Sequence, residues 1–323
     1  MSRSQKPVML IRVCFLFFLF LTAVFYWRCA SRNDKNAAKG PLLSPHCIGD
    51  RESEAVNNEF SNPVKVTING YDSHAMEPFI TRDGSYLLFN SLNDSRDTSL
   101  YYATKVDDAT FKFVGEIAGV NGKPPHLDAV PSMDMEGRFY FISTRYYSHD
   151  YINVCSGNFL HGRVLDLDSQ PGNFYIKSPG WIVMDAEVSP DGQRLYYVNA
   201  HFSGGSVPDR SDIGIARFSN GYFNMLANLP QIMKNINTED FLEYAPSISS
   251  DGLELFYTRL NPCNRQPEIA VAKRNAASEP FGKPERIGAL SGFVEAPSLT
   301  LDRKTLYYHR KDEEVFSIYK VSR

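Results

Sequence analysis

The stretch Pro246-Ser-Ile-Ser-Ser-Asp-Gly252 is one of five copies of a pattern that recurs along the chain. The other copies are Pro78-Phe-Ile-Thr-Arg-Asp-Gly84, Pro131-Ser-Met-Asp-Met-Glu-Gly137, Ala186-Glu-Val-Ser-Pro-Asp-Gly192 and Pro297-Ser-Leu-Thr-Leu-Asp-Arg303. Their starts at residues 78, 131, 186, 246 and 297 lie 53, 55, 60 and 51 residues apart. That period is typical of one four-stranded propeller blade with its loops.

Each part of the pattern has a physical reason. An apolar residue always stands at its third position, where we expect it to point from a short inner strand into the packing between blades. The Asp-Gly pair supplies the positive φ angles of a tight hairpin turn. A second strand with three or four consecutive apolar residues follows, as suits a strand buried on both faces. The third-position residues are Ile80, Met133, Val188, Ile248 and Leu299.

A third strand is visible after four of the five repeats, as in Leu100-Tyr-Tyr-Ala103 and Glu268-Ile-Ala-Val-Ala-Lys273. The third strand of the second blade lies somewhere between Tyr151 and Asp168, and the pattern does not place it. The fifth blade ends after its third strand, so its fourth strand has to come from elsewhere. Residues 60–69 are the candidate, because Phe60-Ser-Asn-Pro-Val-Lys-Val66 resembles Phe281-Gly-Lys-Pro-Glu-Arg-Ile287, the outer strand before the fifth repeat.

The motifs Glu295-Ala-Pro-Ser-Leu and Ala186-Glu-Val-Ser-Pro-Asp-Gly192, and an aromatic strand followed by Thr258-Arg259, resemble the TolB-like (WD-repeat-like) propeller repeat. The resemblance covers residues 60–323. It implies an all-β, five-bladed β-propeller closed by an N-terminal strand, and it says little about function because propellers host many activities.

The N-terminal region predicts export. Residues 1–30 comprise a short cytoplasmic tip and a hydrophobic segment from Val8 to Trp27 with Arg12 near one end. That segment is long enough to span a membrane, and no small residues mark a cleavage site after it, so we expect an uncleaved signal anchor or transmembrane helix. A cleaved signal peptide is the alternative. Residues 31–59 are polar and predict a flexible tether. The propeller, 60–323, would then lie on the extracytoplasmic side, periplasmic or extracellular.

Net charge and cysteine spacing argue against nucleic-acid binding and against a CxxC zinc or redox site. The net charge of −3 and the absence of a basic cluster outside the anchor's flanks argue against nucleic acid as a partner. Beyond the hydrophobic segment the cysteines are Cys47, Cys155 and Cys263, and none has the CxxC spacing of a zinc or redox site. We expect buried thiols or one disulfide whose pairing the sequence cannot choose.

One acidic residue stands one to three positions before the first residue of each repeat. In a propeller, we expect such residues to gather around one mouth of the central channel, where they would bind a cation, a basic group or sugar hydroxyls. The alternative is structural, with each acid fixing the loop between two blades. His74 and His126 lie nearby and are expected to be ordinary loop residues. No cofactor is expected, with calcium left open. The five acids are Glu77, Asp128, Asp185, Glu243 and Glu295.

Two functions follow from this reading. The first is a membrane-tethered propeller that acts as a binding or scaffold module for a protein or glycan partner. The second is a carbohydrate-active enzyme, similar to a glycoside hydrolase, that uses carboxylates at the channel mouth. The sequence contains no GxSxG, Walker-type or HExxH motif, and no residue is assigned a catalytic role.

Overall fold

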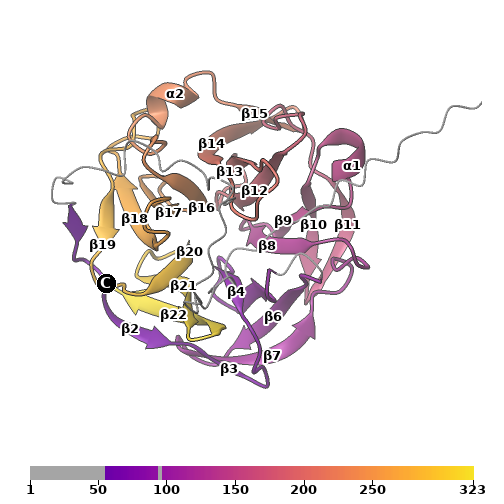
Figure 1. The fold of residues 1–323 in the computed structure, drawn as a ribbon. Coiled ribbons are helices and arrows are strands. Elements are labelled where there is room, and N and C mark those ends of the chain that lie inside the picture. The colour runs from indigo at the N-terminus through magenta and orange to yellow at the C-terminus, as the bar shows by residue number, and fades with distance from the viewer. Residues whose placement is uncertain (1–54, 94–96) are drawn as a thin grey trace, which may run out of the picture.

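The computed structural model describes residues 55–93 and 97–323, whose strands form five sheets arranged radially around a central axis (Figure 1). The predicted all-β, five-bladed propeller is confirmed. We number the blades 1 to 5 in chain order. Their inner strands are β4 (Met76–Ile80), β8 (Asp128–Met133), β12 (Trp181–Val188), β16 (Leu242–Ile248) and β20 (Phe293–Leu299).

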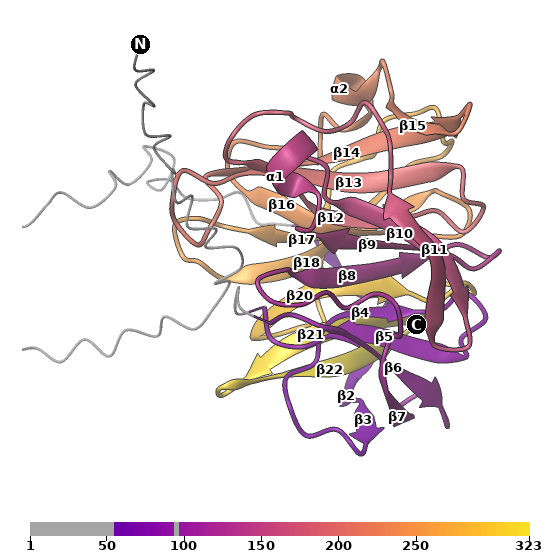
Figure 2. The ribbon, with the colours of Figure 1, turned by 90° about the vertical axis from the view of Figure 1, so that its right-hand side faces the viewer.

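The remaining strands follow outward from the axis in each blade. Figure 2 shows the blades from the side. The second strands are β5 (Tyr86–Asn90), β9 (Arg138–Ser143), β13 (Arg194–His201), β17 (Glu254–Leu260) and β21 (Thr305–Asp312). The third are β6 (Leu100–Lys105), β10 (Val154–Leu160), β14 (Arg210–Ser219), β18 (Pro267–Lys273) and β22 (Val315–Ser322). The outer strands of blades 1 to 4 are β7 (Thr110–Glu116), β11 (Arg163–Ser169), β15 (Tyr222–Met225) and β19 (Glu285–Ile287).

The two helices among the described residues are single turns, α1 (Tyr147–Asp150) and α2 (Leu229–Ile232). Neither is long and apolar enough to span a membrane, and the described part of the chain holds no other helix. The predicted anchor, 1–30, and most of the predicted tether, 31–59, lie outside the described residues.

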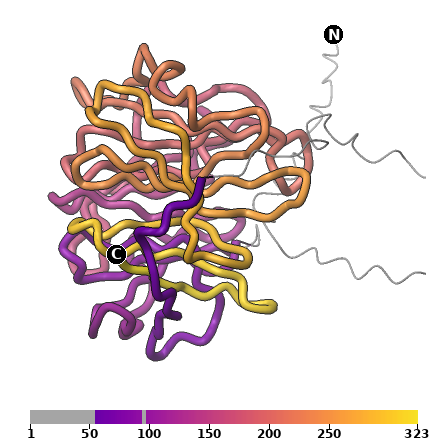
Figure 3. The backbone as a smooth tube through the Cα atoms, turned by 90° about the vertical axis from the view of Figure 1, so that its left-hand side faces the viewer, coloured from indigo at the N-terminus to yellow at the C-terminus, as the bar shows by residue number. Residues whose placement is uncertain are grey.

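Three short strands from the N-terminal segment are added to three different blades. β1 (Val56–Asn57) pairs parallel with β19 of blade 4, and β2 (Ser61–Lys65) pairs antiparallel with β22 of blade 5. β3 (Thr67–Asn69) then pairs parallel with β7 of blade 1. Figure 3 shows this indigo segment crossing the orange and yellow strands on its way to blade 1. Of the residues 60–69, therefore, the first half supplies the fourth strand of blade 5 and the second half extends blade 1.

Five hydrophobic clusters fill the spaces between neighbouring blades, and each third-position residue of the repeat belongs to a different cluster. All five side chains are at most 8 % exposed, as the sequence predicts. The glycine of the Asp-Gly turn also takes the expected positive φ, for example 73° at Gly252, whereas Arg303 adopts 64° without being glycine. The aspartate of the turn acts through its carboxylate, as where Asp251 accepts the Leu253 N–H at 3.1 Å.

The serine at the second position of three repeats joins neighbouring blades. Its hydroxyl accepts the backbone N–H of the third-position residue in the next blade. Glu187 replaces this serine in blade 3 and accepts the Ile248 N–H at 3.1 Å. Phe79 replaces it in blade 1, and there the Arg82 guanidinium reaches the Met133 carbonyl oxygen at 3.1 Å instead. The three serine bonds are Val188 to Ser132 (2.9 Å), Leu299 to Ser247 (3.1 Å) and Ile80 to Ser298 (3.1 Å).

The third strand of blade 2, which the repeat pattern does not place, is β10. Its central residue Gly157 interrupts any apolar run, and a Cβ at that position would lie 2.4 Å from Val164 Cγ1. The close approach of β11 therefore requires glycine where the other blades carry an apolar side chain.

Candidate functional site

The five predicted acids occupy three different positions relative to the repeat. Glu77 and Asp185 directly precede its first residue, Glu295 stands two before it, and Asp128 and Glu243 stand three before it. Successive side chains on a strand point to opposite faces, and each inner strand carries a register shift near this point. As a result, Glu77, Asp185 and Glu295 line one small space in the central channel, while the other two acids do not.

Two hydrogen-bond donors hold the carboxylate of Glu295. The Tyr244 hydroxyl donates to Oε1, and His309 Nε2 lies 3.1 Å from Oε2. The backbone N–H of Glu77 donates to His309 Nδ1 at 3.1 Å. Because Nδ1 accepts that bond it carries no proton, so the Nε2–H of a neutral imidazole donates to Glu295.

Burial favours the protonated form of the other two channel acids. Burial raises the pKa of Glu77 to about 8, and the nearby carboxyl groups of Asp185 and Glu295 add to the effect. Burial likewise raises the pKa of Asp185 to about 7, although its bond from the Ala245 N–H at 3.2 Å favours the charged form. Asp185 therefore also joins blade 3 to blade 4.

The channel offers little room around these groups. The space lined by Glu77, Asp185, Tyr244 and Glu295 measures about 10 Å³. A neighbouring space, lined by the first-position prolines of four repeats, measures about 30 Å³. A cavity that holds a single water measures roughly 10–15 Å³ in these terms, so neither space admits a sugar ring. Further along the axis the Arg82 guanidinium pairs with Glu187 at 3.2 Å, with both side chains less than 8 % exposed.

Asp128 and Glu243 have partners away from the channel. Asp128 accepts the Gly122 N–H at 2.6 Å and pairs with Arg145 at 2.6 Å. Glu243 Oε1 accepts both the N–H and the hydroxyl of Thr238, at 3.1 and 2.8 Å. Both carboxyls thus fix loops. Burial also raises the pKa of Glu243 to about 8.

The two predicted loop histidines do not join the three channel acids. His74 Nδ1 accepts the Phe316 N–H at 3.3 Å, and neither His74 nor His126 lines the space around those acids. Among the described residues, no group of three or more His, Cys, Asp or Glu side chains is placed to hold a metal ion. Calcium stays an expectation from the sequence alone.

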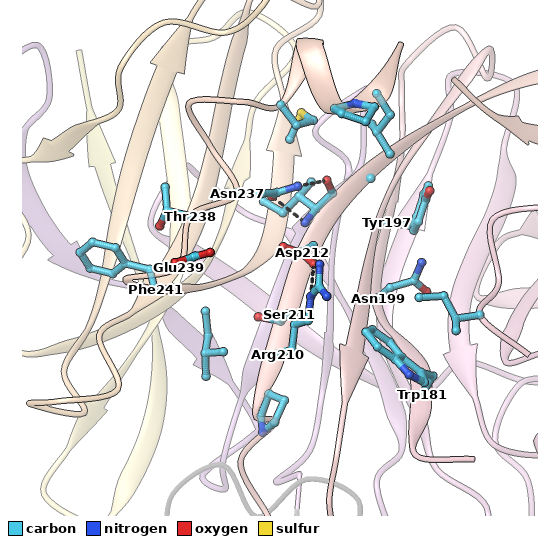
Figure 4. A pocket seen from close by; sticks show the side chains of 18 of the residues that line it. Trp181, Tyr197, Asn199, Arg210, Ser211, Asp212, Asn237, Thr238, Glu239 and Phe241 are labelled. Carbon is cyan, nitrogen blue, oxygen red and sulfur yellow. Dashed lines mark hydrogen bonds and ion pairs between the residues drawn. The ribbon is translucent and has the colours of Figure 1, made fainter. Parts of the chain in front are cut away.

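A much larger depression of about 900 Å³ lies at blade 3. It follows the outer edge of β14, because β15 covers that edge only from Ala216 to Ser219 and leaves Arg210–Ile215 uncovered. We call it the β14 groove. Figure 4 shows Thr238, Glu239 and Phe241 on one side of β14 and Tyr197, Asn199 and Trp181 on the other.

Three of the five charged residues that line the β14 groove are in ion pairs. Asp209 lies 2.7 Å from His201 Nδ1, and Arg210 Nε lies 2.8 Å from Asp212. The Arg210 guanidinium carbon also lies 6.0 Å from the centre of the Trp181 ring. Lys234 and Glu239 also line the groove and form no ion pair among the described residues, so the groove presents charged groups as well as neutral polar and apolar side chains.

The sequence contains a signal for this groove that does not by itself reveal a site. The interval of 60 residues between the repeats starting at 186 and 246 is the longest of the four. The surplus residues form the 202–209 loop and the 226–241 connection, both of which line the groove. Insertions of this kind on one face of a repeat fold often form a binding surface.

The chain matches no protein-family model and no curated protein. Its fold is similar to that of solved glycoside hydrolases. A family 117 glycoside hydrolase from Zobellia galactanivorans matches with a TM-score of 0.53 at 13 % identity, over 82 % of this chain and 91 % of that one. An endo-arabinase from Bacteroides thetaiotaomicron matches with a TM-score of 0.52 at 13 % identity, over 80 % and 97 %.

TolB from Acinetobacter baumannii also matches, with a TM-score of 0.44 and 15 % identity over 77 % of this chain. This chain spans 55 % of that TolB chain. At such identities the likenesses to the glycoside hydrolase and the endo-arabinase show the fold alone.

Proposed function

We propose that this protein is a binding propeller held on the extracytoplasmic side of a membrane, and that it takes its protein or glycan ligand in the β14 groove. The observation that carries this proposal is the difference in volume between the β14 groove and the space around the channel acids. The groove measures about 900 Å³, in the range of ligand pockets, whereas the carboxylate cluster in the channel is left with about 10 Å³.

Two features support the extracytoplasmic location. Cys263 is disulfide-bonded, and disulfides persist mainly in oxidising compartments. Cys155 is a buried free thiol, which any compartment would tolerate. The basic, apolar N-terminus adds the export signal that the sequence predicts.

The binding role is tested with two methionines of similar exposure. Met225 lines the groove and is 49 % exposed, while Met135 lies in the turn after β8 and is 64 % exposed. We expect Met225→Arg to abolish binding of full-length protein in nanodiscs to its ligand in an oligosaccharide and ectodomain panel, and Met135→Arg to leave it intact. Equal binding by both variants would remove the groove from the proposal.

A second candidate is a carbohydrate-active enzyme that uses the channel acids. It is favoured by the convergence of Glu77, Asp185 and Glu295, and by pKa values raised to about 8 and about 7 on the first two, which suit a general acid. The neighbours above TM-score 0.5 include proteins whose names describe glycoside hydrolases.

Aryl glycosides, assayed with and without calcium, separate the two candidates. Hydrolysis that Glu77→Gln or Asp185→Asn abolishes would establish the enzyme and replace the binding proposal. Hydrolysis that persists unchanged in both variants would come from a contaminant. If no glycoside is cleaved while the groove variants alter binding, the enzyme candidate is eliminated.

A further inference from the structure

Cys263 lies in the loop that joins β17 to β18 in blade 4, and it is disulfide-bonded. Asn261 shapes this loop, because its Oδ1 accepts the Cys263 N–H and its carbonyl oxygen accepts the Arg265 N–H, both at 2.8 Å. The loop is exposed from Pro262 to Gln266. Cys263 therefore stands at the surface of the propeller, where a segment that is distant in the sequence can reach it.

The partner of Cys263 lies in the N-terminal region. The chain has five cysteines, and of the four others Cys155 is a buried free thiol. The remaining candidates are Cys14, Cys29 and Cys47, which all lie outside the described residues. The described chain begins at residue 55 and pairs at once with blade 4, the blade that carries Cys263. The N-terminal region is therefore joined to the same blade as the loop.

The distance from the start of the described chain to this loop is short. Arg286 of β19 pairs with Val56 on one side and with Ala270 on the other, so Val56 and Ala270 lie about 10 Å apart, across two strand spacings. From Ala270, three residues of β18, or about 10 Å, lead back to Pro267 at the edge of the loop. The nine residues from Cys47 to Val56 span up to about 30 Å, so that cysteine reaches the loop.

The other two cysteines are less suited to the bond. Cys14 falls inside the hydrophobic segment 8–27 that is predicted to span a membrane, out of reach of an exposed propeller loop. Cys29 is 27 residues from Val56, three times as far along the chain as Cys47. Because the effective concentration of two linked groups falls with about the −3/2 power of the length between them, Cys29 meets the loop roughly five times less often.

We propose that Cys47 and Cys263 form a disulfide that fastens the N-terminal tether to blade 4. Its formation removes one proton from each thiol and two electrons in all, which a disulfide-containing oxidant of an oxidising compartment takes up as it becomes two thiols. Pro262, the residue before Cys263, lines the β14 groove, so the bond holds the tether beside that groove. The bond goes beyond the binding role and does not depend on it.

Specific proteolysis at two inserted sites tests the pairing in the full-length protein, isolated without reductant from a host that exports it. After cleavage between residues 49 and 50, we expect fragments 1–49 and 50–323 to stay joined on a non-reducing gel and to separate on a reducing one. Cleavage between residues 36 and 37 is the matched control, since it lies before Cys47 and should free fragment 1–36 without reductant. If fragment 1–36 stayed joined, or if fragment 1–49 separated without reductant, the proposal would be wrong.

Peptide mapping and thiol labelling identify the two cysteines directly. Trypsin without reduction should yield peptide 40–51 linked to peptide 260–265, each with one cysteine. Cys29→Ser should leave Cys263 unreactive toward a maleimide, whereas adding Cys47→Ser should make it react, because the residue is exposed. A Cys263 that reacts in Cys29→Ser alone, or a linked pair that joins two copies of the chain, would overturn the proposal and leave the binding role untouched.

Discussion

At the scale of single residues, the propeller depends on side chains that accept a backbone N–H from the next blade. The second-position serines of the repeat accept such a bond, and so do the channel acid Asp185 and its neighbour His309. Each such bond satisfies a buried backbone donor. The acids were therefore hard to interpret from sequence, because a carboxylate that accepts an N–H and one that binds a ligand look identical there.

Ser298 provides the first prediction. Replacing it with alanine leaves the buried Ile80 N–H without an acceptor, which should lower the free energy of unfolding by about 1–3 kcal/mol. Urea denaturation with an unchanged m-value would measure this. Ser211→Ala is the control, because its hydroxyl has no partner and its loss should cost nothing. A similar loss in both variants would show that the inter-blade bond does not matter.

The channel acids predict how stability depends on pH. Their folded-state pKa values, about 8 for Glu77 and about 7 for Asp185, lie above the ordinary values of 4.5 and 3.8. The unfolded chain releases these protons first, so stability is greatest below about pH 4 as far as these groups are concerned, and it falls as pH rises to about 8.

Asp185→Asn checks this directly. Asparagine keeps an oxygen for the Ala245 N–H but cannot ionise, so the decline in unfolding free energy from about pH 5 to about pH 8 should become shallower than in wild type. A surface change such as Asp166→Asn, in the exposed part of β11, should leave the slope unaltered. A slope identical in wild type and Asp185→Asn would contradict the proton assignment.

At the scale of elements, the repeat pattern predicts the strands that carry apolar runs, because these are buried between blades on both sides. It fails for β10, where close packing requires Gly157. It also could not separate the five acids, because the register shift of each inner strand turns both of the last two positions before the repeat toward the channel. The β14 groove arises because β15 is only four residues long, and the sequence marks it only through the longer interval between the repeats starting at 186 and 246.

Phe60 tests whether the N-terminal segment stabilises the blades that it joins. Its ring is 2 % exposed and meets Phe256 edge-on with centroids 5.7 Å apart. Phe60→Ala should lower the free energy of unfolding by about 3–5 kcal/mol and the melting temperature accordingly. Tyr222→Ala, at an aromatic ring 53 % exposed on β15, should cost less than about 1 kcal/mol. Equal melting temperatures would mean that the segment contributes little.

For the whole molecule, the two ends of the described chain meet at blades 4 and 5. The Arg323 guanidinium binds Glu254 through two bonds of 2.8 and 2.5 Å and Glu59 through one of 2.7 Å. Glu254 belongs to β17, so a single side chain links the last residue to blade 4 and to the segment before β2. The ring is thus fastened by main-chain pairing and by this ion pair together.

Arg323→Met removes the ion pair but keeps an apolar stem of similar length near Phe60. Because Glu254 is only 8 % exposed, its carboxylate would be left buried with a weaker contact to Lys273 at 3.5 Å. We expect a loss of about 2–3 kcal/mol in urea denaturation, and partial recovery when Glu254→Gln removes the stranded charge as well. Lys105→Met, which breaks a solvent-exposed pair with Asp108, should cost no more than about 1 kcal/mol. If the double variant were as unstable as the sum of the two single variants, the pair would not be coupled, and the ring would be held by strand pairing alone.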